Sequence, residues 1–159
     1  MTTEELFLFI KNNCQQEVVL LAETTPPTFL IDAADLVPLC AVLHGNESTY
    51  FDMLSCIIGV DNGPIENTME VIYHLYTIPF NVFIGLKVKL SRQDPVIPSV
   101  TSIWKAADWY EREVFDLFGI AFTDHPDLKR ILLPADWEGH PLRKDYKHQD
   151  YYRDIKVEY

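Results

Sequence analysis

The residues that could do chemistry gather in two stretches of the sequence, at positions 111–119 and 136–146. The first stretch carries the carboxylates of Glu111, Glu113 and Asp116, and paired carboxylates can serve in general acid–base catalysis. On a helix, however, Glu111 and Glu113 lie two positions apart and point about 160° away from each other. We therefore expect that they share no substrate and form no acid–base pair.

The same stretch also offers ion pairs along a helix. Arg112 lies four residues after Asp108 and four before Asp116, a spacing that places opposite charges side by side on a solvated face. Such exposed pairs contribute roughly a few tenths of a kcal/mol. Glu113 instead falls at the margin of the apolar face, where a carboxylate needs a basic partner or hydrogen bonds. The arginines later in the chain are candidate partners.

The histidines favour structural roles over a metal site. None of the 5 follows the His-x-x-x-His or His-Glu-x-x-His spacing that places two ligands on one helix face. His125 precedes Pro126 and His140 precedes Pro141, so both should lie in extended backbone. We expect both to make structural hydrogen bonds. An enzyme that uses either one with nearby carboxylates is the alternative.

Cysteines and glycines argue against several cofactor sites. Cys14, Cys40 and Cys56 lie too far apart for a zinc knuckle or an iron–sulfur ligand set, and their odd number favours free, buried thiols. The 6 glycines form no phosphate-binding loop and no nucleophile elbow. We therefore predict no metal, no bound cofactor and no catalytic residue in this chain.

Charge divides the chain into two regions. The formal net charge of −11 argues against nucleic acid as a partner, because phosphate would be repelled. Residues 1–123 hold 6 basic and 16 acidic side chains, whereas residues 124–159 hold 7 basic and 8 acidic ones. No apolar run of about 18 residues suggests a membrane span. The acidic start of the chain lacks the positive charge of a signal peptide, which predicts a protein that stays on the cytoplasmic side.

Hydrophobic periodicity predicts the elements that position these residues. Helical spacing predicts helices over about residues 4–13 and 35–44, the second with Asp35 as its N-cap. Short connections between successive strands favour antiparallel pairing. The chain should therefore form an α+β fold with a mostly antiparallel sheet packed by helices. The strand-like runs lie at about 17–22, 29–31, 49–60, 69–78 and 82–90.

The clearest helix should run from Ser99 or Ser102 to Phe118, with Gly119 as its C-cap glycine. Trp104 and Trp109 fall off its core face, where a later segment or a partner would cover them. The predicted core face of this helix consists of Ile103, Ala106, Ala107, Tyr110, Val114, Leu117 and Phe118.

After Gly119 the sequence loses both helical and strand periods, yet it is too rich in aromatic residues to be disordered. We predict a domain over residues 1–119 and a long, extended but irregular tail over residues 120–159 that lies on its own domain or straps onto another subunit. Tryptophan and arginine often anchor interfaces. The predicted partner interface consists of Trp137, Gly139, His140, Pro141, Leu142, Arg143, Lys144, Asp145 and Tyr146.

The two stretches together resemble the signatures of the C subunit of respiratory complex I, the NADH:quinone oxidoreductase. Residues 136–146 resemble the second signature of that family, and the likeness extends from about Phe51 to Tyr146. The residues that match the first signature are Glu111-Arg112-Glu113, Asp116-Leu117-Phe118, His125, Lys129 and Ile131-Leu132. The first fifty residues carry no diagnostic match.

The resemblance implies a peripheral-arm scaffold subunit without a cofactor, on the cytoplasmic side of a bacterial inner membrane. It implies that the protein docks the hydrogenase-like D subunit, which forms part of the quinone site, and lies beside iron–sulfur subunits. The complex as a whole would use FMN, iron–sulfur clusters and quinone and would translocate protons. The resemblance further implies structural roles for Glu111, Arg112, Glu113, Asp116, Gly119, His125, Pro126, Lys129 and Arg130.

Two alternatives remain beside this reading. The chain could be the equivalent subunit of a related membrane-bound hydrogenase or of a ferredoxin-dependent complex, or it could be a stand-alone enzyme. Because the sequence ends soon after Tyr146, we expect a C subunit and not a fusion of C and D.

Overall fold

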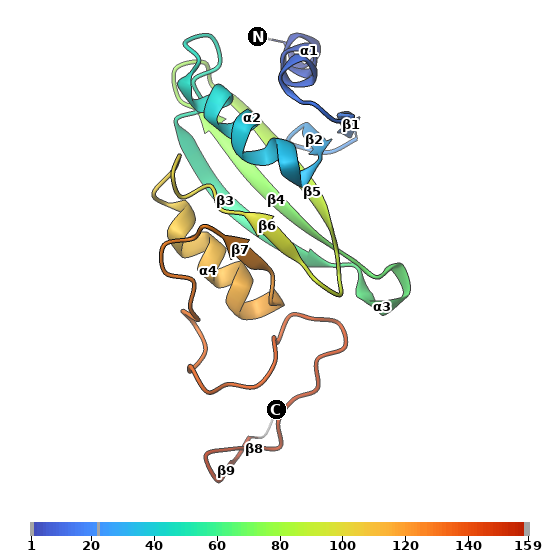
Figure 1. Cartoon of the computed structure of the whole chain (residues 1–159), viewed down its shortest axis with the longest axis vertical. Coiled ribbons are helices and arrows are strands. Elements are labelled where there is room, and N and C mark those ends of the chain that lie inside the picture. Colours follow the sequence, from blue (N-terminus) through green and yellow to red (C-terminus); the bar gives the residue numbers. More distant parts are fainter. Residues whose placement is uncertain (1, 22, 158–159) are drawn as a thin grey trace.

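The computed structural model describes residues 2–21 and 23–157 and has an α+β fold (Figure 1). The helices are α1 (Thr3–Asn13), α2 (Ala33–Gly45), α3 (Gly63–Glu66) and α4 (Ala107–Phe118). The strands are β1 (Val19–Leu21), β2 (Thr28–Ile31), β3 (Met53–Asp61), β4 (Thr68–Thr77), β5 (Val82–Ser91), β6 (Val96–Pro98), β7 (Ala121–Thr123), β8 (Tyr151–Tyr152) and β9 (Ile155–Lys156). The strand predicted at 17–22 is β1, and Ala22 lies outside the described residues.

The main sheet is mixed, with five strands in the order β1-β2-β5-β4-β3. Strands β3, β4 and β5 form the antiparallel meander that the short connections predict. Strand β2, however, pairs with β5 in parallel, and β6 pairs with β7 in parallel as well. Among the described residues three of the four pairings of this sheet are antiparallel, so the sheet is mixed and not antiparallel throughout. Helix α2 and strands β3 and β4 lie between β2 and β5 in the chain, and a connection of that length allows the two strands to pair in parallel.

One face of the sheet carries the core. Every second residue of β4 from Met69 to Thr77 is buried, whereas the alternate residues are only half-buried. This period of two is typical of a sheet with helices on one side. Helices α2 and α4 and the β6–β7 pair lie in front of the sheet in the view of Figure 1. Helix α1 begins with a capping box between Thr2 and Glu5.

Two helix starts differ from the prediction. Helix α2 begins at Ala33, with Asp32 and not Asp35 as its N-cap, and the carboxylate of Asp35 is buried and accepts backbone amides of the segment after α1. Helix α4 begins only at Ala107, because residues 101–106 form turns. Within these turns Trp104 is buried and donates from Nε1 to a backbone carbonyl at 3.1 Å, so it belongs to the core, contrary to the prediction.

The helix α4 packs closely on β3 because Gly59 has no side chain. A Cβ atom at position 59 would lie 2.7 Å from the ring of Phe118, so any larger residue would push the helix away. Val114 lies against the same glycine. The predicted core residue Ala106 is exposed, because it lies just before the helix begins.

The tail follows β7, which is still part of the body because it pairs with β6. Residues 124–150 contain no helix and no strand, and a short β8–β9 hairpin follows them. The tail turns repeatedly near the end of α4 (Figure 1), so it is irregular as predicted but is not extended throughout. No residue in the range 124–157 is buried as a whole. The division at position 119 stays a prediction.

Candidate functional site

The tail caps the C-terminal end of α4. The last carbonyl groups of a helix have no partner within it and must find one elsewhere. The carbonyl of Asp116 accepts from Nδ1 of His140 at 2.9 Å, and that of Leu117 accepts a tail amide at 3.0 Å. The carbonyl of Phe118 accepts from Nε of Arg143 at 2.6 Å. The positive charge of Arg143 also complements the negative end of the helix dipole.

Gly119 allows the tail to come this close. Its φ of +73° lies in the left-handed region that favours glycine, which confirms the predicted C-cap. A Cβ atom at this position would lie 2.6 Å from the ring of His140 and 2.9 Å from Nη2 of Arg143. A side chain here would therefore displace the tail from the helix end.

Asp116 is the main anchor of the tail. Its Oδ2 atom accepts three consecutive amides, those of residues 131–133, at 3.0, 2.8 and 2.9 Å, and its Oδ1 atom accepts Nη1 of Arg130 at 2.7 Å. Burial opposes the charge, but these hydrogen bonds hold the pKa of Asp116 below its usual value. The expectation that Asp116 pairs with Arg112 on a solvated face was wrong, because the tail covers that face and buries Asp116 completely.

Arg130 joins the helix to two further points of the tail. Its Nη2 atom donates to the carbonyls of Trp137 and Gly139, at 2.9 Å each. Its Nη1 atom donates to both the side chain and the carbonyl of Asp116. A planar guanidinium group with several donors suits this arrangement better than the single ammonium of a lysine. We call the contacts of Asp116, Arg130, His140 and Arg143 the helix clasp.

Arg112 supports the helix clasp from the neighbouring turn of α4. Its guanidinium donates to the carbonyls of Lys129 and Arg130 at 3.2 and 3.4 Å and lies over the exposed ring of Trp109. The side chain of Lys129 points to Asp127 in an exposed ion pair. Lys129 therefore contributes mainly its backbone carbonyl, whereas Arg130 contributes its carbonyl to Arg112 and its side chain to the helix clasp.

A second set of contacts fastens the tail to the ends of β3 and β5. The carboxylate of Asp61 is 4% exposed and accepts the amides of Lys144 and Gly63 at 2.8 and 2.9 Å. Arg92 holds the same carboxylate with two bonds, of 2.7 and 3.1 Å, and also pairs with Asp145. Although burial opposes it, hydrogen bonds from Arg92 and the two amides lower the pKa of Asp61 to about 2. We call these contacts the sheet clasp.

The sequence did not reveal the sheet clasp. Asp61 begins a turn-like run and Arg92 follows a strand, so each has an ordinary local explanation. The contact partners are 31 and 83 positions apart, and no helical or strand period connects them. The opposite charges of Asp61 and Arg92 lie at the ends of β3 and β5, on either side of β4, and their proximity becomes visible only once the register of these three strands is known.

Glu111, on the buried face of α4, lies close to His125 of the segment after β7. Both side chains are fully buried, with Nε2 of His125 4.0 Å from Oε2 of Glu111. Oε1 of Glu111 accepts the amide of Val100 at 2.8 Å, while Oε2 has no hydrogen-bond partner among the described residues. Burial raises the pKa of Glu111 to about 7. Because His125 accepts the amide of Asp127 at Nδ1, its Nε2 carries the proton and faces the carbonyl of Asp108.

Neither side chain of this pair has exposed surface, so both are closed off from solvent in the structure. Glu113 is exposed, so the prediction that it lies at the core margin, where it would need a basic partner or hydrogen bonds, was wrong. The divergence of Glu111 and Glu113 along the helix is confirmed, since one is buried and the other faces outward.

The outward face of the tail carries apolar side chains. Leu132 is 62% exposed and Leu142 is 51% exposed. Trp137 is half-buried and donates from Nε1 to the hydroxyl group of Tyr146 at 3.1 Å, and its ring contacts that of Tyr152 in a tilted arrangement. Thus several polar groups of the tail form hydrogen bonds to the body, while Leu132 and Leu142 remain exposed. Whether the residues predicted at a partner interface touch a partner stays a prediction.

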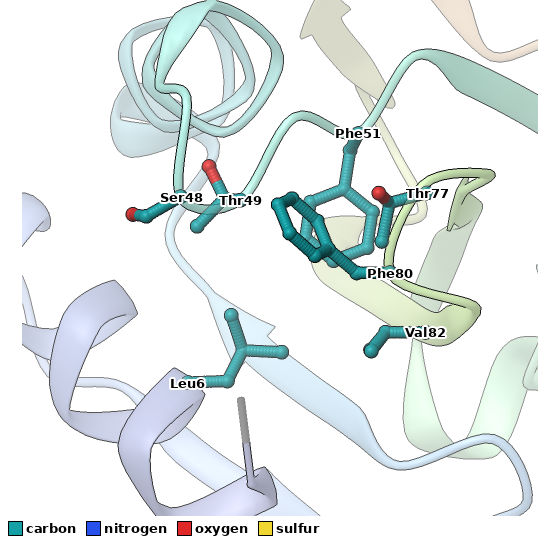
Figure 2. Close-up of a pocket in the computed structure, with 7 residues that line it drawn as sticks. All are labelled: Leu6, Ser48, Thr49, Phe51, Thr77, Phe80 and Val82. Carbon is teal, nitrogen blue, oxygen red and sulfur yellow. The ribbon is translucent and has the colours of Figure 1, made fainter.

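One apolar cavity of the structure is too small to hold a small-molecule ligand. Side chains of α1, of the loop after α2 and of the β4–β5 connection line an apolar cavity of about 10 Å³ (Figure 2). That is room for one water molecule and far below the size of a ligand pocket. In residues 2–21 and 23–157, no three His, Cys, Asp or Glu side chains come together to hold a metal ion. Within the same ranges no helix has the length and apolar character to span a bilayer.

Comparisons with known proteins identify relatives of this architecture. Residues 29–152 match the family model of the respiratory-chain NADH dehydrogenase 30 kDa subunit. The C subunit of the NADH-quinone oxidoreductase of Chloroherpeton thalassium is 43% identical over 84% of this chain, which spans 55% of that relative. The C subunit of the Moorella thermoacetica enzyme is 45% identical over 77% of this chain and 81% of its own length. The C/D subunit of the NADH-quinone oxidoreductase of Psychrobacter arcticus is 45% identical over 76% of this chain and 21% of its own length.

Solved structures agree on the fold. The trypsin-resistant fragment of Nqo5 superposes with a TM-score of 0.61 at 25% identity, covering 80% of this chain and all of that fragment. A chain of an archaeal membrane-bound sulfane sulfur reductase superposes with a TM-score of 0.74 over 97% of this chain and 98% of its own length. At 22% identity, the second likeness concerns the fold alone.

Proposed function

The chain belongs to the family of the 30 kDa subunit of respiratory-chain NADH dehydrogenase, and we propose that it acts as a peripheral, non-catalytic scaffold subunit of a complex I type NADH:quinone oxidoreductase. Its task is to dock a hydrogenase-like D-type subunit, which forms part of the quinone site, and to lie beside iron–sulfur subunits. It works on the cytoplasmic side of the membrane and reaches the membrane only through the complex. FMN, iron–sulfur clusters and quinone belong to other subunits, and the complex couples electron transfer to proton translocation.

The clamped tail with its outward apolar side chains carries this proposal. Two clasps hold the tail on the body, so the exposed Leu132 and Leu142 are presented on a fixed surface. Fixing a surface before binding lowers the entropy cost of association. An isolated protein gains nothing from exposed leucines beside a half-buried Trp137, whereas an interface would bury them.

The identity of the partner is supported by the C/D relative from Psychrobacter arcticus, in which a single polypeptide bears both names. Fusion keeps two domains close, and an unfused pair must achieve the same by an interface. A non-catalytic role is supported by the closed pair of Glu111 and His125, whose side chains have no exposed surface.

The test is assembly in the native membrane. The affinity-tagged chain is expressed in place of the natural one, the complex is extracted in mild detergent, and the recovered D-type subunit is quantified together with NADH:quinone activity. We expect Leu132→Glu to lower recovery by about tenfold or more, because a charge would be buried at an interface anchor. Trp137→Ala and Arg143→Ala should also lower it, the first by removing an anchor and the second by loosening the helix clasp.

Ile65→Glu is the matched control, because Ile65 is 98% exposed in α3 and lies in the body. It should assemble normally. Normal recovery of the D-type subunit with full activity in Leu132→Glu and Arg143→Ala would contradict the docking proposal, as would NADH:quinone activity in the purified chain alone.

A further inference from the structure

The two edges of the main sheet differ in how they are protected. Strand β1 forms one edge and is only three residues long, and short edges offer little backbone for pairing. Strand β3 forms the other edge and spans nine residues. Between residues 53 and 60 it contains no charged residue and no proline, the usual devices that prevent unwanted pairing. Its one irregularity is a bulge between Leu54 and Cys56.

The free side of β3 has backbone groups that await partners. Each residue of an edge strand pairs on one side only, so alternate amides and carbonyls point away from the sheet. Within the described ranges, the hydrogen bonds of the backbone of residues 53–60 all belong to the ladder with β4. An unprotected edge of this length is a template for another strand.

An apolar groove runs beside this edge. Residues 57–59 of β3 form one side, and Val114 and Leu117 of α4 form the other. Leu142 of the tail adds to the lining, and the groove encloses about 230 Å³. Ile58 is 40% exposed beside it. An added strand points every second side chain to the same side, so its apolar residues would enter this groove.

Charge indicates the chemistry of the occupant. Glu113 is the single charged side chain that lines the groove, and it is exposed. A second copy of this chain would bring a further net charge of −11 to an already acidic molecule. A segment with a lysine or arginine opposite Glu113 would complement the groove instead.

We propose that the β3 edge receives an extended segment of another protein subunit, which adds a strand beside residues 56–60 and places apolar side chains in the groove and a basic side chain at Glu113. Backbone bonds hold the segment, and the groove and Glu113 select its sequence. This site lies mainly on the body, with Leu142 contributed by the tail, and it rests on the proposed place of the chain in a complex.

Hydrogen exchange followed by mass spectrometry tests the backbone pairing. The purified full-length chain is compared with the intact complex extracted from the membrane in mild detergent. We expect peptides covering residues 53–60 to contain amides that exchange at least about tenfold more slowly in the complex, because outward amides gain partners. Equal exchange of these peptides in both samples would overturn the proposal.

A photo-crosslinking residue at position 58 identifies the occupant within the intact complex. A crosslink to a segment of another subunit that alternates apolar residues and contains a lysine or arginine supports the proposal. A crosslink to a second copy of this chain, or to none, overturns it. Ile58→Lys should abolish the slow exchange, whereas its control Ile65→Lys, another exposed isoleucine, should keep it. An equal loss in both variants would also contradict the site.

Discussion

The body and the tail of this molecule are held together by different forces. Apolar side chains such as Phe29, Leu75 and Leu86 are fully buried in the body, whereas no residue in the range 124–157 is buried as a whole. The tail is fastened instead by hydrogen bonds and ion pairs that end on two buried carboxylates of the body, Asp61 and Asp116. The body can therefore form its core from its own sequence, while the tail takes its place only on a body that is already folded.

The difference explains why two acidic residues lie inside the body. A buried carboxylate costs free energy unless hydrogen bonds and a cation compensate it. Asp116 receives this compensation from the tail, through Arg130 and three amides. Asp61 receives it from Arg92 and from the amide of Lys144. The contacts at Asp116 are thus reciprocal, because the tail is ordered by a carboxylate that the tail itself compensates, whereas Asp61 is compensated mainly within the body by Arg92.

Asp116→Ala should have the largest effect on the attachment of the tail to the body. The substitution leaves Arg130 and three amides without their acceptor, and we expect the free energy of unfolding to fall by about 3 kcal/mol. Urea denaturation measures this loss. Trypsin should then cleave the tail after Lys129 or Arg130 under native conditions, well before it cleaves the body.

Leu75→Ala provides the control from the body. It should cost about 2–5 kcal/mol by leaving a cavity in the core, yet the tail of the folded protein should keep its protection against trypsin. If Asp116→Ala leaves the tail as protected as in the unaltered chain, the helix clasp does not hold it and the contrast between the regions disappears.

Glu111→Gln should show that the stability of the body and that of the sheet clasp depend on pH in opposite directions. The folded-state pKa of Glu111 is about 7, above the ordinary value of 4.5, so its stabilising contribution is complete below pH 4.5 and declines as the pH rises through 7. On the order of 2 kcal/mol should be lost across this window. The pKa of Asp61 is lowered to about 2, so the sheet clasp loses strength only as the pH falls from about 4 toward 2.

Urea denaturation at pH 4.5, 6 and 8 measures the effect. Glu111→Gln should show a smaller decline of unfolding free energy from pH 4.5 to 8 than the unaltered chain. If the free energy of unfolding depended on pH equally in the two proteins, ionisation of Glu111 would not destabilise the fold, and the prediction would be wrong. The body should thus weaken toward alkaline pH and the sheet clasp toward acid.

Local patterns in the sequence predicted the elements of the body well. Gly119 marks the end of α4, and the meander of β3, β4 and β5 lies where hydrophobic runs and turns placed it. These features depend on neighbours in the chain, and such neighbours are visible in the sequence. The parallel pairing of β2 with β5 was not predicted, because α2, β3 and β4 separate the two strands in the sequence.

The candidate site was predicted in its residues but not in its geometry. The motif of Asp116 and Arg130 was singled out, but helical periodicity placed Asp116 in solvent, since it cannot account for a tail that returns from beyond position 130. Helical periodicity also placed Glu113 at the core margin, whereas it is exposed. The bonds of His140 and Arg143 to the end of α4 were not predicted, and their place at a partner interface stays a prediction.

Arg153→Ala should have the smallest effect and marks where the fastened part of the tail ends. Arg153 pairs with Asp136 at 2.9 Å, but both side chains are exposed, and exposed ion pairs contribute little to stability. We expect no measurable change in urea denaturation or in the rate of tryptic cleavage at Lys129 and Arg130. The matched change Arg130→Ala removes an arginine whose Asp116 partner is buried, and it should release the tail. If Arg153→Ala released the tail as well, the β8–β9 hairpin would belong to one cooperative unit with the helix clasp, and burial of the carboxylate would not be what separates an effective clasp from an ineffective one.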